Sequence, residues 1–210
     1  MITYLWISGW AVPPEWLAGQ ARAAFPQARH EAVSPTAAEA ALAGGAFDRL
    51  GAYSLGTLWL LRQADRIAKN IPVSLLAPIF AFPAEAGLGG RIPLAQLRLQ
   101  RRQLQKDPAA ALADFAERSG LAALKIPVPD DEFSPAHLAE LDLGLRWLES
   151  WTAPPPPPAH WRGWIGKDDA LLDAAAMQQH WPNLQIVPQA GHAPGPLLQA
   201  AAQSGAPITA

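Results

Sequence analysis

Short apolar runs recur along the chain and alternate with segments of helical periodicity. The runs are four to eight residues long and bounded by turn-forming residues, which is typical of buried parallel strands; they cover residues 2–7, 29–33, 49–53, 73–80, 161–165 and 184–187. Most alternate with helical patterns, which cover residues 14–25, 36–42 and 55–68. This alternation predicts an α/β fold with a mostly parallel sheet flanked by helices.

The alternation stops after the fourth apolar run. Between residues 81 and 151 the sequence has no convincing strand and contains three helical patterns, at 94–106, 108–118 and 134–151. We expect a helical cap (81–151) inserted into a core made of residues 1–80 and 152–210. The proline-rich stretch 153–161 predicts a stiff linker back to the sheet; the alternative, a polyproline ligand for another domain, is less favoured because structured-looking sequence flanks it.

Ser54 lies where the third strand pattern meets a helix pattern. A nucleophilic serine needs a sharp strand-to-helix turn with small neighbours, and Ala52 and Gly56 flank Ser54 at two residues' distance. Alanine replaces the first glycine of the usual G-x-S-x-G pattern, and a Ser-x-Gly pair alone is weak evidence. Ser54 is therefore a candidate nucleophile, and the case for it depends on whether the sequence also offers a base and an acid.

The partners follow in the order acid, then base, each after a later strand pattern. Asp168 and Asp169 follow the fifth pattern, and His192 follows the sixth within Gly191-His192-Ala193-Pro194. In a parallel sheet these loops converge at one edge, which favours a Ser-His-Asp triad with Ser54. Taken singly, either aspartate is compatible with a helix cap and His192 with an ordinary loop.

An oxyanion hole needs two backbone N–H donors near the serine. Leu55 follows Ser54 directly, and Trp10, in Ser8-Gly9-Trp10 after the first strand pattern, is the candidate for the second donor. Ser8 stands where many proteins with this loop carry histidine. Trp10 is also compatible with a purely structural role as a core or cap aromatic.

Composition narrows the function further. The chain has 210 residues, half of them apolar, with 16 Lys and Arg against 18 Asp and Glu. The near balance of charge gives no overall attraction to nucleic acid or acidic membranes. Absence of cysteine excludes disulfides and thiolate catalysis. No apolar run has the length of a membrane span, and the N-terminus lacks the features of a signal peptide, so we expect a cytoplasmic protein.

Together these residues resemble the α/β-hydrolase superfamily over nearly the whole chain. More narrowly, the sequence resembles the pimeloyl-acyl carrier protein methyl ester esterases of biotin synthesis. The residues that carry this likeness are Ser8-Gly9-Trp10 with Trp16, Tyr53-Ser54-Leu55-Gly56, His192-Ala193-Pro194, and two cap stretches, LRLQRRQLQKDPAAALADF (97–115) and ELDLGLRWLESWTAPP (140–155). The family's Gly-x-x-Asp pattern selects Asp169 over Asp168 as the triad acid.

The resemblance implies hydrolysis of the methyl ester of a pimeloyl chain on its carrier protein, without metal or organic cofactor. We expect a monomer, although the sequence leaves the oligomeric state open. Ser54 attacks, His192 acts as base and then acid, and Asp169 orients the imidazole. Carrier proteins are acidic, and Arg98, Arg101, Arg102 and Lys106 have a spacing that places them on one helix face, opposite Leu97 and Leu104. This stripe is either a docking surface or an ordinary solvated face.

Two other functions remain open at this point. A broad short-chain carboxylesterase or an acyl thioesterase shares the triad but not the substrate. A catalytically silent scaffold is the alternative from another class, suggested by the departures at Ser8, Ala52 and Thr57. Presence of all three triad candidates argues against it.

Overall fold

A single parallel sheet organises the chain. In the computed structural model the strand order is β2-β1-β3-β4-β5-β6, and every neighbouring pair is parallel. The strands are β1 (Thr3–Ile7), β2 (Arg29–Val33), β3 (Arg49–Tyr53), β4 (Val73–Leu76), β5 (Arg162–Gly166) and β6 (Gln185–Val187). The structure describes residues 1–124, 126 and 133–204, so parts of the predicted cap (125, 127–132) and core (205–210) lie outside the described residues.

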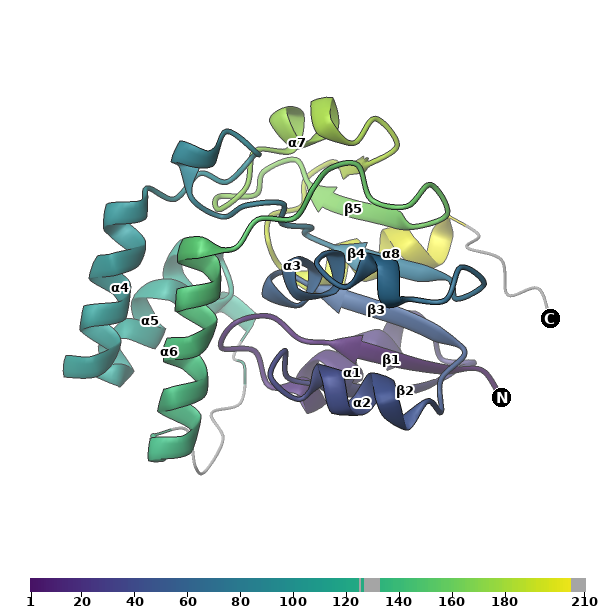
Figure 1. Cartoon of the computed structure of the whole chain (residues 1–210), viewed down its shortest axis with the longest axis horizontal. Coiled ribbons are helices and arrows are strands. Elements are labelled where there is room, and N and C mark those ends of the chain that lie inside the picture. Colours follow the sequence, from purple (N-terminus) through teal and green to yellow (C-terminus); the bar gives the residue numbers. More distant parts are fainter. Residues whose placement is uncertain (125, 127–132, 205–210) are drawn as a thin grey trace.

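Helices cover both faces of this sheet (Figure 1). The core helices are α1 (Pro14–Ala24), α2 (Ala38–Gly44), α3 (Leu55–Leu61), α7 (Ala174–His180) and α8 (Pro194–Gln203). The β1-α1-β2 and β3-α3-β4 connections run in opposite directions across the sheet, so right-handed crossovers place α1 and α3 on opposite faces. Helix α8 packs against α1 and shares its face. The α/β class and the parallel sheet predicted from the sequence are confirmed.

Two predicted elements are shorter in the structure by four residues or more. The strand predicted over 73–80 ends at Leu76, because Ala77 has a φ of 48° and turns the chain out of the sheet. Ile79 and Phe80 are fully buried although they lie after the end of the strand. Their apolar side chains therefore reflect burial and not strand structure. The helix predicted over 55–68 ends at Leu61 and is followed by the 3₁₀ turn η1 (Ala64–Arg66).

The cap is built from α4 (Leu94–Lys106), α5 (Pro108–Ser119) and α6 (Pro135–Ser150), between β4 and β5. Two 3₁₀ turns, η2 (Ala84–Ala86) and η3 (Ala122–Leu124), accompany them. An antiparallel bridge between Ala81 and Thr152 closes the base of the insertion, and Ala153 N donates to Phe80 O at 2.7 Å. Helix α4 packs on both α5 and α6, and the three gather beyond one end of the sheet in Figure 1. Within the described part of the chain, no helix is long and apolar enough to cross a membrane.

Candidate active site

Ser54 lies at the turn between β3 and α3. Its φ of 52° and ψ of −119° are strained for a residue with a side chain, as in a nucleophile elbow. The turn requires glycine at position 56, because a Cβ there would lie 2.4 Å from Ile7 O. Ala52, where glycine is usual, is fully buried within β3 and pairs with Ile7, so the alanine is accommodated.

The structure joins the three triad candidates in one hydrogen-bonded chain. The His192 Nε2 and Ser54 Oγ atoms are 3.0 Å apart, and His192 Nδ1 lies 2.8 Å from Asp169 Oδ2. The other carboxylate oxygen, Asp169 Oδ1, accepts from the N–H groups of Leu171 at 2.8 Å and Leu172 at 3.1 Å. With the proton on Nδ1, His192 donates to the carboxylate and leaves Nε2 free to accept the serine proton. Asp169 is fully buried, and its oxygens have the donors that a buried carboxylate needs.

The two aspartates take different positions in the structure. Asp168 is exposed, whereas Asp169 faces His192. Neither caps the following helix: the N-cap of α7 is Asp173, whose Oδ1 accepts from Ala176 N at 3.0 Å. This hydrogen bond lowers the pKa of Asp173, and the Arg91 charge adds to the effect.

Two supporting residues were missed by sequence reasoning. Tyr53 OH donates to His192 O at 3.0 Å, and Arg91 Nη1 donates to Asp169 O at 2.9 Å. Burial, with the Asp169 charge nearby, raises the pKa of Tyr53 well above its usual value, so its hydroxyl remains a donor. The only sequence signal for Tyr53 was its place next to Ser54, and Arg91 had none.

The loop after β1 lies directly on the nucleophile. A Cβ on Gly9 would lie 3.1 Å from Ser54 Cβ. Ser8 Oγ donates to Val12 O at 2.6 Å, so the serine that stands in place of histidine closes this loop itself. Among the described residues, neither Trp10 N nor Leu55 N has a backbone acceptor. Both N–H groups are therefore available for an oxyanion.

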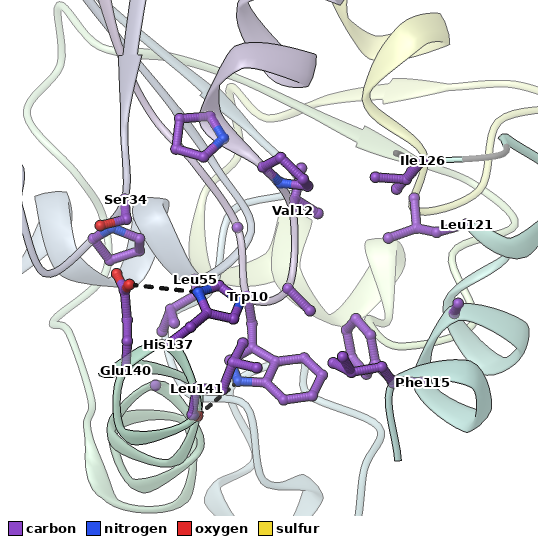
Figure 2. A pocket seen from close by; sticks show the side chains of 18 of the residues that line it. Trp10, Val12, Ser34, Leu55, Phe115, Leu121, Ile126, His137, Glu140 and Leu141 are labelled. Carbon is purple, nitrogen blue, oxygen red and sulfur yellow. Dashed lines mark hydrogen bonds and ion pairs between the residues drawn. The ribbon is translucent and has the colours of Figure 1, made fainter. Parts of the chain in front are cut away.

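A cavity of about 750 Å³ lies between this loop and the cap. Figure 2 shows its apolar part around Trp10, Phe115, Leu121 and Ile126, and its polar part at Ser34, His137 and Glu140. Trp10 and Leu55 line it. Ser54, the chain neighbour of Leu55, and His192 are themselves buried, with only 5% and 2% of their surfaces exposed. Cap helix α6 forms one wall of the cavity, with His137, Glu140 and Leu141 among its lining residues.

The four predicted docking residues do not form one outward stripe. Arg98, Arg102 and Lys106 are exposed. Arg101 instead turns toward α6, where its Nε lies 3.1 Å from Asp142 Oδ1 and its Nη1 lies 3.0 Å from Glu149 Oε2. The prediction that Arg101 belongs to the exposed face was wrong, because helical spacing does not reveal which neighbouring helix offers carboxylates. Leu97 and Leu104 are buried on the opposite side, as predicted.

His30 is a second buried histidine, remote from the triad in sequence and in contacts. Its Nδ1 accepts from Trp6 Nε1 at 3.0 Å, and its Nε2 lies 3.0 Å from Phe25 O. Burial lowers the pKa of His30, which favours the neutral ring. Its role is to satisfy the Trp6 indole within the core. Among the described residues no group of three histidine, aspartate or glutamate side chains is placed to hold a metal ion.

Solved structures with the same arrangement of elements include an esterase from Exiguobacterium antarcticum. It is 11% identical, with a TM-score of 0.76, over 97% of this chain and 90% of that one. An α/β-hydrolase enzyme from a Medee basin deep-sea metagenome gives a TM-score of 0.58 at 11% identity, over 100% and 91% of the two chains. The chain has the α/β-hydrolase fold.

The fold alone does not specify a reaction. The bottromycin epimerase BotH also matches, with a TM-score of 0.61 at 13% identity, over 100% of this chain and 91% of that one. The sequence itself matches no protein-family model and no curated protein. What distinguishes one activity from another within the α/β-hydrolase fold is therefore the site.

Proposed function

We propose that the protein is a serine carboxylesterase. The observation that carries the proposal is the buried chain from Ser54 Oγ through His192 to Asp169, on a strained turn beside two available N–H donors. This is the constellation that acyl transfer requires: a nucleophile, its base, the group that orients the base, and donors for the oxyanion.

The reaction proceeds in two steps. Ser54 Oγ attacks the ester carbonyl carbon while His192 Nε2 takes the hydroxyl proton, and the N–H groups of Trp10 and Leu55 hold the oxyanion. Collapse of the tetrahedral intermediate breaks the C–O bond, and His192 gives its proton to the leaving alkoxide. Water, activated by the same imidazole, then hydrolyses the acyl-enzyme to the free acid and restores Ser54. Asp169 stabilises the imidazolium formed in each step.

Steady-state hydrolysis of a small aryl ester by the wild type and by Ser54→Ala tests this step. We expect turnover by the wild type and a fall in kcat of about 10⁴-fold or more in the variant. Equal rates in both proteins would refute the nucleophilic role of Ser54. Hydrolysis by neither would favour a non-catalytic scaffold.

For the substrate we propose the methyl ester of a pimeloyl chain on acyl carrier protein. The proposal rests on the resemblance of the motifs and is supported by two features. The cavity is mainly apolar and within the size range of small-molecule sites. The exposed Arg98, Arg102 and Lys106 on α4 offer positive charge to an acidic carrier. The working unit in this proposal is a cytoplasmic monomer.

The experiment compares kcat/KM for the carrier-linked methyl ester, a small aryl methyl ester and a matched thioester. Preference for the carrier-linked ester supports the proposal, and preference for a small ester or the thioester assigns a different hydrolase activity. In a second comparison, Arg98→Glu with Arg102→Glu is expected to lower kcat/KM for the carrier substrate at low salt. Activity on the small ester stays unchanged. Arg66→Glu is a surface control, because Arg66 is also exposed but lies in η1, outside the cap.

A further inference from the structure

Cap helix α6 contacts Trp10 and Leu55 of the proposed oxyanion hole at Gly144. A Cβ built at this position would lie 2.7 Å from Trp10 Cδ1 and 3.1 Å from Leu55 Cδ2. Trp10 and Leu55 come from different elements, the loop after β1 and the first turn of α3. They are also the two proposed oxyanion donors, and both line the cavity.

The second contact is a hydrogen bond. Trp10 Nε1 donates to Leu141 O at 2.8 Å, so the buried indole is held to the cap one helical turn before Gly144. Residues three apart lie on one face of a helix, so Leu141 and Gly144 present the same face to Trp10. The Phe115 ring of α5 packs edge-on against the indole, with 4.6 Å between the ring centroids. The indole therefore has little room to move away from α6.

Glycine inside a helix needs a reason, because it is less favourable there than alanine. Gly144 is the tenth of sixteen residues in α6, and the close approach to Trp10 supplies the reason. Gly19 in α1 provides the contrast, since a Cβ there would meet nothing within 4 Å.

We propose that Gly144 is a positioning residue for the oxyanion hole. The absence of a side chain lets α6 pack closely against Trp10 and Leu55, and the Trp10–Leu141 hydrogen bond keeps α6 in that position. The position of the cap thereby fixes where the two N–H donors point. This inference rests on the proposed esterase function and adds a link between cap and chemistry.

The test compares Gly144→Ala with the matched control Gly19→Ala, using aryl esters of two acyl lengths. A Cβ at 144 must displace the rigid indole or the helix, and misplacement of catalytic groups by about 1 Å costs about a hundredfold in rate. We expect Gly144→Ala to lower kcat by about ten- to a hundredfold, equally for both acyl lengths, with KM nearly unchanged. Affinity for a boronic acid transition-state analogue should fall by a similar factor. Gly19→Ala should retain wild-type values.

Two results would overturn the proposal. One is wild-type kcat in Gly144→Ala; the other is a loss confined to KM that grows with acyl length, because that pattern belongs to a residue that only shapes the cavity. If Gly144→Ala does not fold, Trp10→Phe decides. This variant keeps the backbone N–H and an aromatic ring but removes the bond to Leu141 O, and we expect kcat to fall about fivefold at unchanged KM. Unaltered kcat there also refutes the proposal. A wild type inactive on every ester is a separate result, which refutes the esterase function itself.

Discussion

Tyr53 and His192 are bound to each other across the active site. The tyrosine hydroxyl donates to the backbone carbonyl of His192 at 3.0 Å, and the two rings lie 5.4 Å apart. Tyr53 is the last residue of β3 and His192 lies in the loop after β6, so this bond ties the proposed base to the strand that precedes the proposed nucleophile, Ser54.

We therefore expect Tyr53→Phe to lower both stability and kcat. The variant leaves the His192 carbonyl without its buried donor, which costs about 1–3 kcal/mol. The histidine loop then has more freedom, and kcat falls while KM changes little. Chemical unfolding and steady-state kinetics measure the two effects. A variant with wild-type stability would contradict the structural role of the bond.

Arg91 binds the loop that carries Asp169, the proposed triad acid. Its Nη1 donates to Asp169 O, and its backbone N donates to Leu171 O at 2.9 Å. We expect Arg91→Met to reduce kcat several-fold, at the scale of about one hydrogen bond, without abolishing it. Arg66→Met is the control, because it removes only exposed contacts, an ion pair with Glu39 and a hydrogen bond to Gln63. The same kinetics in both variants would exclude a positioning role for Arg91.

Because His30 is buried, we expect the free energy of unfolding to fall in mild acid. Burial lowers its pKa in the folded protein below the ordinary value near 6.5, so the unfolded chain binds the proton more readily. The contribution of neutral His30 is present above that ordinary value and is lost as pH falls toward the lowered folded pKa. Unfolding free energies measured from pH 7.5 to 5 for the wild type and His30→Asn test this. The variant should show a shallower loss, and parallel curves would contradict it.

Arg101 forms ion pairs within the cap, and we expect these pairs to stabilise the fold. Its two contacts, to Asp142 and Glu149, involve side chains that are 30%, 16% and 12% exposed, so solvent screens them only partly. We expect Arg101→Met to reduce the free energy of unfolding by about 0.5–1 kcal/mol. Arg98→Met, on the exposed face of the same helix, should change it less. A larger loss of unfolding free energy in Arg98→Met than in Arg101→Met would contradict the stabilising role of the Arg101 ion pairs.

Residues whose positions follow from strand and loop order were the ones that sequence reasoning located. Ser54, Asp169 and His192 each follow a strand of a parallel sheet, and such loops meet at one edge whatever the side-chain details. Contacts that depend on side-chain direction were not accessible. Tyr53, Arg91 and the Trp10 indole bond groups 78 to 139 positions away, and no periodicity in the sequence encodes those pairings.

Element ends were the other limit. The apolar run 73–80 describes burial correctly, but the backbone turn at Ala77 ends the strand four residues earlier than the run. A short apolar run has the same pattern whether it forms a buried strand or another buried segment. Arg101 shows a similar ambiguity for charged residues. Its helical spacing is compatible both with a solvated arginine and with an arginine paired to a neighbouring helix, and the structure has the second.

Covalent labelling of Ser54 tests the central proposal most directly. A fluorophosphonate reacts with a serine only when a base and an oxyanion hole activate it. Mass spectrometry of the labelled protein should find one equivalent on the peptide that contains Ser54, and none in Ser54→Ala or at much reduced rate in His192→Ala. A folded wild-type protein that remains unlabelled, or that is labelled equally in Ser54→Ala, would contradict the account.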